Sequence, residues 1–134
     1  IGDRAAFALD DLIGAAAEGD AVALDRHCAR SFAEVEAIQL LRNCARHFQR
    51  LHQVVARMAD GDSFETAAGA LRPPLFWSQR DHAQRQSRLW SASRIGQALE
   101  RLIEAEAQAM RHYAIKDEIA QRALMDIAAL ARRK

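Results

Sequence analysis

Residues 40–59, LLRNCARHFQRLHQVVARMA, contain the clearest structural pattern in the sequence. Apolar side chains recur there at spacings of three and four residues, which is the period of an α-helix. They are Leu41, Cys44, Phe48, Leu51, Val55 and Met58. The opposite side carries Arg42, Arg46 and Arg50. The segment therefore predicts a long amphipathic helix with one face in the core and the other in solvent.

Two helices are expected before this segment. The residues EGD at 18–20 end one helix and begin the next, because Gly19 can adopt a left-handed conformation and Asp20 can accept from free N–H groups. Asp3 is expected to cap the first helix. The buried side of the first helix is expected to hold Phe7, Leu9, Leu12, Ile13 and Ala16. The buried side of the second is expected to hold Val22, Leu24, Cys28 and Phe32.

Clear breaks follow the long helix. Gly61 is expected to end it, and Asp62 with Glu65 fits a capping box for a short helix. Pro73 and Pro74 fix the backbone and remove two N–H donors, so the chain leaves the helical conformation there.

Three more helices complete the predicted architecture. A helix is expected from about Ser78 to Leu89, with Asp81 and Arg85 paired across one turn. Ser91 is expected to cap the next helix, with Trp90 packed on Ile95 as a hydrophobic staple.

The last two helices have expected buried sides of their own. For the first of them this side comprises Ile95, Leu99, Leu102, Ile103 and Met110. A final helix begins near Asp117, pairs Glu118 with Arg122, and is expected to bury Ile119, Ala123, Ile127 and Leu130. Six or seven helices with short loops and no strand pattern predict an all-α compact bundle, one domain over residues 1–134.

Composition excludes several classes of protein. A net charge of +1 gives no general attraction to nucleic acid or membranes, and six glycines with two prolines are too few for a β-sandwich. Cys28 and Cys44 fall on apolar helix faces, which favours buried free thiols in a reducing, cytoplasmic compartment. No apolar run approaches the roughly 20 residues that span a bilayer.

No motif for catalysis or metal binding is present in the sequence. GxxxxGK[ST], HExxH and the paired Glu-x-x-His of di-iron bundles are missing, and the five histidines share no ligand spacing. We therefore expect no catalytic residue, no cofactor and no metal. A DNA-binding helix-turn-helix around Gly19 is disfavoured, because its second helix begins with the acidic sequence DAVALD.

Residues 71–90, LRPPLFWSQRDHAQRQSRLW, hold both prolines and both tryptophans of the chain. Trp77 follows Phe76 and precedes Arg80, and an aromatic ring on a rigid turn beside a guanidinium can stack on unpaired bases. Alternatively, Phe76 and Trp77 plug the end of the bundle, which is the interpretation that the residues alone favour.

The order of these segments resembles that of a known family. In sequence they are GD, AEGD, ARSFAE, LLRNCARHFQRLH, LRPPLFW, QSRLWSASRIGQALERLIEAEAQAMR and QRALMDIAAL. This order is similar to that of the C-terminal domain of the delta subunit of the bacterial DNA polymerase III clamp loader. The similarity covers nearly the whole chain, and RPP and RLW before a long helix carry most of it.

The resemblance implies an all-α collar domain. Collar domains pack side by side in a ring that holds the clamp loader together while the sliding clamp is loaded in DNA replication. The implied partners are the other clamp loader subunits, gamma/tau and delta prime. The sliding clamp would be contacted only through two preceding domains, so the chain, which lacks an initiator Met, is expected to be the C-terminal fragment of a longer protein.

The resemblance also implies contact between the inner face of the collar and primer-template DNA. The matching aromatic residues are Trp77, with Arg80 beside it, and Tyr113 near the end of the long helix. This domain of the DNA polymerase holoenzyme is expected to be non-catalytic.

Two positions depart from the family pattern. The family has Gly and Pro in the link after AE, where this chain has AEVEAI with Val35 and Ile38, so its second and third helices could run together or be joined by a stiffer turn. Arg111 replaces a frequent Lys. The alternative to a collar domain is a stand-alone small helical regulator that binds DNA or a ligand; an enzyme is the least favoured interpretation.

Overall fold

The computed structural model describes residues 2–133, except for the side chains of residues 2–8 and of Ala29. This described part contains seven α-helices and no strand, which confirms the all-α prediction. The helices are α1 (Gly2–Ala17), α2 (Ala21–Ser31), α3 (Ala37–Ala59), α4 (Phe64–Gly69), α5 (Arg80–Leu89), α6 (Ala92–Arg111) and α7 (Lys116–Arg132). Two 3₁₀ turns, η1 (Trp77–Gln79) and η2 (Tyr113–Ile115), precede α5 and α7. The predictions for Asp3 and Phe7 concern side chains outside the described part.

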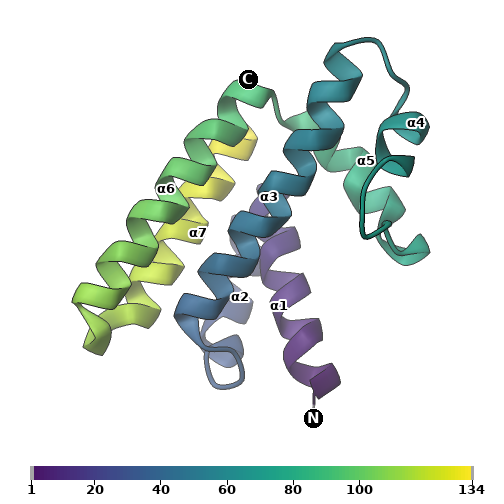
Figure 1. Ribbon diagram of the computed structural model, residues 1–134. Coiled ribbons are helices and arrows are strands. Elements are labelled where there is room, and N and C mark those ends of the chain that lie inside the picture. Colours follow the sequence, from purple (N-terminus) through teal and green to yellow (C-terminus); the bar gives the residue numbers. More distant parts are fainter. Residues whose placement is uncertain (1, 134) are drawn as a thin grey trace.

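Helix α3 occupies the centre of the bundle. The hairpin of α6 and α7 packs on one side of it, and α4 and α5 lie on the other (Figure 1). Helices α1 and α2 pack together and contact α7. The largest fully buried side chains come from five helices, and they are Leu12, Leu24, Leu40, Leu41, Phe48, Ile95, Leu102, Leu124 and Ile127.

The buried face of α3 is the one that its periodicity predicts. Leu41, Cys44 and Phe48 are at most 1% exposed. Leu51 and Val55 are also buried, and Met58 is half-buried. The free energy of burying this stripe explains why a 23-residue helix forms here.

Glycines end helices, and N-caps begin them, where the sequence predicts. Gly19 has φ +74° and Gly61 has φ +109°, backbone conformations that residues with a Cβ avoid. Asp20 accepts from the N–H of Ala23 over 3.0 Å. Ser91 accepts from the N–H of Arg94 over 3.2 Å and begins α6.

The link between α2 and α3 is a turn despite its missing Gly and Pro. Glu36 ends this turn as the N-cap of α3, accepting from the N–H groups of Ile38 and Gln39 over 2.9 and 3.0 Å. Val35 is buried and Ile38 half-buried. The two helices therefore stay separate, because a carboxylate cap and an apolar anchor replace the missing helix breakers.

Helix α4 begins differently from the prediction. Ser63, not Asp62, is its N-cap, with Oγ accepting from the N–H of Thr66 over 3.2 Å. Asp62 lies one residue too early for this role and instead pairs with Arg57 over 3.0 Å. Glu65 bonds Arg80 rather than completing a capping box.

Two predicted ion pairs within helices are replaced by others. Arg85 binds Glu18, in the turn after α1, instead of Asp81, whose carboxylate lies 3.8 Å from Arg80. Arg122 pairs with Asp126 rather than with Glu118. Glu18 and Asp126 are less exposed than Asp81 and Glu118, so solvent screens their charges less and they attract the guanidinium groups more strongly.

The predicted buried side of α6 is partly wrong. Ile95 and Leu102 are buried and Leu99 is half-buried, but Ile103 is 68% and Met110 57% exposed. The remaining buried positions are the alanines at 98, 105 and 109. Small side chains let α6 pack closely on its neighbours, and this packing turns the larger side chains outward. On α2, Val22 is likewise exposed.

Trp90 is a core residue, as its position before the α6 cap suggested. It is 3% exposed, and its ring contacts Phe48 edge-on at a centroid distance of 4.8 Å. Ile95 belongs to the same buried cluster.

Candidate interaction surfaces

The outer side of α6 carries an apolar strip, which we call the α6 surface: the exposed Ile103, Ala107 and Met110, with the half-buried Leu99 at one end. These residues are spaced by three or four, so they share one face of the helix. That face adjoins the buried line of Ile95 and Leu102, and Leu99 at the boundary packs partly against the core. Exposed apolar side chains gathered in one strip are typical of a surface that another protein covers.

Charged side chains border the α6 surface differently on its two sides. Toward α3, Glu106 pairs with Arg42 over 3.2 Å. On the opposite border lie Glu100 and Glu104, both exposed. Glu104 accepts a 3.3 Å hydrogen bond from the amide of Gln108, and neither glutamate forms an ion pair with any described residue. One border is thus neutralised and the other is acidic.

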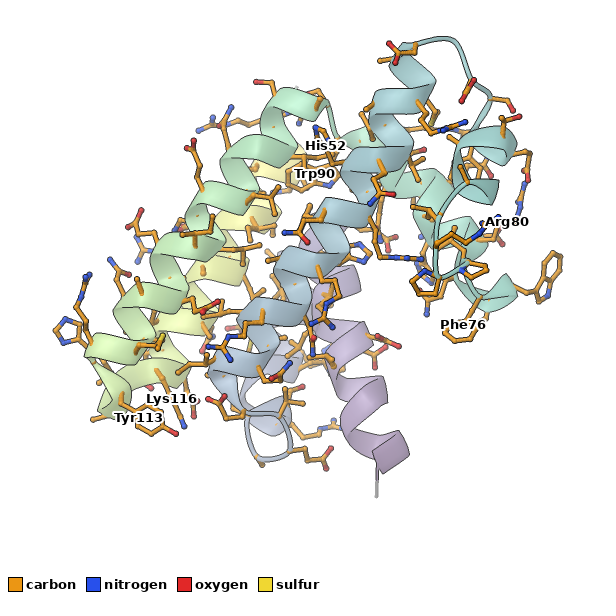
Figure 2. The ribbon with its side chains drawn as sticks, in the orientation of Figure 1. His52, Phe76, Arg80, Trp90, Tyr113 and Lys116 are labelled. Atoms are coloured by element: carbon orange, nitrogen blue, oxygen red, sulfur yellow. The ribbon has the colours of Figure 1, made fainter. Side chains whose placement is uncertain are left out.

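The turn between α6 and α7 extends this exposed area with Tyr113 (58% exposed) and Ile115 (49%). The Nζ of Lys116 lies 3.8 Å from the centre of the Tyr113 ring (Figure 2). The same Nζ is 3.4 Å from Oε2 of Glu36, the cap of α3. Burial raises the pKa of Glu36, but the two N–H donors and Lys116 outweigh it and lower that pKa overall.

Phe76 and Trp77, which we call the aromatic turn, project from the other end of the molecule. They are 78% and 88% exposed, so the interpretation that they plug the bundle is wrong. The reason is a small second core that already fills this space. It consists of Val54, Phe64, Ala67 and Leu71, with Met58, Ala68, Leu75 and Ala83 packed against it.

Arg80 follows the aromatic turn closely, but its guanidinium is engaged elsewhere. It pairs with Glu65, and its Cζ lies 5.6 Å from the centre of the Phe64 ring. Trp77 and Arg80 therefore share one segment, and Arg80 holds that segment against α4. Figure 2 shows Tyr113 at the far side of the bundle from Phe76 and Arg80, so the three predicted DNA-contacting residues do not form one cluster.

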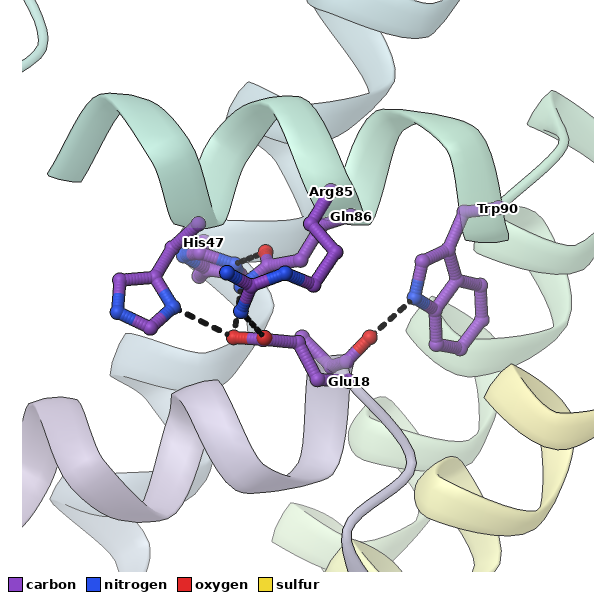
Figure 3. Close-up of polar contacts among 7 residues, drawn as sticks. Glu18, His47, Arg85, Gln86 and Trp90 are labelled. Carbon is purple, nitrogen blue, oxygen red and sulfur yellow. Dashed lines mark hydrogen bonds and ion pairs between the residues drawn. The ribbon is translucent and has the colours of Figure 1, made fainter.

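A polar network around Glu18 was not predicted from the sequence. The carboxylate accepts from Arg85, from Nδ1 of His82 over 2.8 Å and from the amide of Gln86 over 3.3 Å (Figure 3). Nε2 of His47 in turn donates to Oε1 of Gln86 over 2.7 Å. The network joins the turn after α1 to α3 and α5, and its members line an open cleft of about 870 Å³.

The electrostatics of this network follow from burial and hydrogen bonding. Burial raises the pKa of Glu18, but hydrogen bonds from Arg85, His82 and Gln86 outweigh it, so the pKa lies below its ordinary value. Burial lowers the pKa of His47, which favours the neutral imidazole. A charged carboxylate and a neutral histidine thus fasten the polar helix α5 to the bundle.

Reactive groups in the described residues are few. Burial raises the pKa of Cys28 to about 11 and that of Cys44 to about 12, so both thiols stay protonated near neutral pH. Both are free and buried, as the sequence predicted. Among the described residues no group of three His, Cys, Asp or Glu side chains is placed to hold a metal ion. None of the helices in this part of the chain has the length and apolar character to cross a membrane.

Comparisons with models of protein families, with curated proteins and with solved structures gave no match to this chain.

Proposed function

We propose that this chain is the collar domain of a clamp loader delta subunit, and that it holds the subunit in a ring with gamma/tau and delta prime. The proposal begins from the order of sequence segments that resembles this family. An all-helical fold agrees with it. The function is one of binding, and no step of chemistry is assigned to the domain.

The observation that carries the proposal is the α6 surface. Ile103 and Met110 lie on the outside of a helix whose other face is fully packed. Exposing such side chains to water is unfavourable, and covering them on association contributes about 25 cal/mol per Å² of apolar area. A domain that serves as a subunit contact explains why these residues are apolar.

The proposal includes a second contact, with the single-stranded part of primer-template DNA. Its main element is Trp77, whose ring is 88% exposed and free to stack on an unpaired base. Arg80 positions the aromatic turn through Glu65 and Phe64 rather than meeting a phosphate directly. Tyr113, on the opposite side of the bundle, is assigned a separate contact with the same DNA.

A pull-down with the tagged domain tests the proposal. The purified domain is first shown to be folded by circular dichroism and is then mixed with gamma and delta prime subunits. We expect both subunits to be retained by the domain. A folded domain that retains neither of them would contradict the collar assignment.

A further inference from the structure

The unequal borders of the α6 surface define what kind of partner fits it. On the α3 side, Arg42 already neutralises Glu106. On the other side, Glu100 and Glu104 lie one turn apart and exposed, and no described cation pairs with either. A partner helix that covers the apolar strip must therefore run beside a row of two negative charges.

We propose that the α6 surface binds an amphipathic helix of a partner subunit whose apolar stripe is flanked on one side by Arg or Lys. The apolar stripe covers Ile103 and Met110, and the basic flank pairs with Glu100 and Glu104. The identity of the partner as a sibling clamp loader subunit rests on the proposed function. The chemistry of the binding face does not depend on that function.

The length of the strip suits a helix as the occupant. From Leu99 to Met110 the strip covers twelve residues, and the eleven steps between them rise about 16 Å at 1.5 Å per residue. That length spans about three turns of a second helix packed alongside α6. The carboxylates contribute mainly to the choice of partner, because a like-charged flank would be repelled.

Two synthetic peptides provide the probe. Each is an amphipathic helix of about 20 residues with a leucine stripe, long enough to be helical in water. One carries Arg beside the stripe and the other carries Glu at the same positions. Binding of each fluorescently labelled peptide to the full chain is measured by anisotropy. We expect the Arg-flanked peptide to bind at least about tenfold more tightly than the Glu-flanked one.

Three variants locate the binding face. Ile103→Asp is expected to weaken binding of the Arg-flanked peptide by about tenfold or more. Val22→Asp is the matched control, because Val22 is also 68% exposed but lies on α2; it should leave binding unchanged. The double variant Glu100→Arg with Glu104→Arg should reverse the preference between the two peptides. All four positions are exposed, so circular dichroism should show the native fold in each variant.

Equal affinity for the two peptides, no binding of either, or equal loss with Val22→Asp and Ile103→Asp would overturn the inference. So would self-association of the chain through α6 that excludes the peptide. The pull-down separates this inference from the proposed function. If gamma and delta prime bind the Ile103→Asp variant as well as the original chain, the collar role stands and the α6 assignment fails. If neither subunit binds but the Arg-flanked peptide does, the α6 assignment stands and the collar role fails.

Discussion

The indole Nε1–H of Trp90 donates a 2.7 Å hydrogen bond to the carbonyl oxygen of Ala17, the last residue of α1. The last carbonyls of a helix lack partners within it, so this bond satisfies a buried acceptor and joins α1 to the start of α6. It also gives Trp90 a structural role that is independent of any binding function.

Trp90→Phe should therefore destabilise the protein. The substitution keeps an aromatic ring beside Phe48 but removes the donor, leaving the Ala17 carbonyl unsatisfied at a cost of about 1–3 kcal/mol. Urea unfolding followed by circular dichroism measures the change. Trp77→Phe is the matched control and should leave the free energy of unfolding unchanged, because Trp77 is exposed. Equal effects of the two substitutions would contradict the assignment.

Three glycine-to-alanine substitutions should differ in sign and size. Gly96→Ala should stabilise the protein by about 0.5–1 kcal/mol, since Gly96 lies within α6 and no atom would crowd the new Cβ. Gly61→Ala should destabilise it by about 1–2 kcal/mol through its positive φ alone. Gly19→Ala should cost more than Gly61→Ala, because its Cβ would lie 2.9 Å from Cγ of Arg132 and 3.3 Å from the Ala128 carbonyl.

Thermal unfolding of the three variants measures this order. A Gly19→Ala protein as stable as the Gly61→Ala protein would show that the contact between the α1–α2 turn and α7 is looser than described.

Because of the network at Glu18, the free energy of unfolding should decrease in two steps as the pH is lowered. The pKa of His47 is lowered by burial and by Arg50, against opposing effects of Gln86, Asp10 and Glu18. The unfolded chain thus takes up a proton at His47 first, and the free energy of unfolding falls as pH drops below about 6.5. The pKa of Glu18 is also lowered, so a second loss begins below about 4.3, where unfolded Glu becomes protonated.

Denaturant unfolding across this pH range measures both steps. His47→Gln should remove the upper step and keep a donor for Gln86. Glu18→Gln should reduce the lower step while leaving the upper one. If either variant showed the same dependence of stability on pH as the original chain, the network would not be linked to folding.

In the assembled loader, Trp77→Ala should weaken binding to a primer-template with a single-stranded overhang by about 1–3 kcal/mol, because one unpaired base loses the indole ring on which it stacks. Fluorescence anisotropy with labelled DNA measures the affinity. The free energy of unfolding should not change, since the Trp77 ring contributes nothing to the core. Val22→Ala is an exposed control on α2. Unchanged DNA affinity in the Trp77 variant would remove Trp77 from the proposed contact.

Features set by neighbours in the chain were predictable from the sequence. The stripe on α3, the Gly19 turn with its Asp20 cap, and the Ser91 cap all depend on residues within a few positions of one another. The predicted N-cap of α4 was wrong by one residue. Asp62 and Ser63 are both good caps, and only one of them can accept from the first free N–H groups.

Contacts between distant residues were not predictable. Nothing local indicates that Arg85 meets Glu18, or that Arg94 donates to the carbonyls of Leu89, Leu130 and Arg133 at the ends of α5 and α7. The burial of α6 was ambiguous for a related reason. Its apolar residues cover a wide arc, and only the packing of α3 and α7 selects which part of that arc is buried.

Hydrogen–deuterium exchange of the domain, alone and mixed with gamma and delta prime subunits, tests the proposed collar role most directly. We expect slower exchange on mixing in residues 96–115, which include the α6 surface and the α6–α7 turn, and no change in α4. A folded domain whose exchange stays the same in every segment when the subunits are added would contradict the role in the ring.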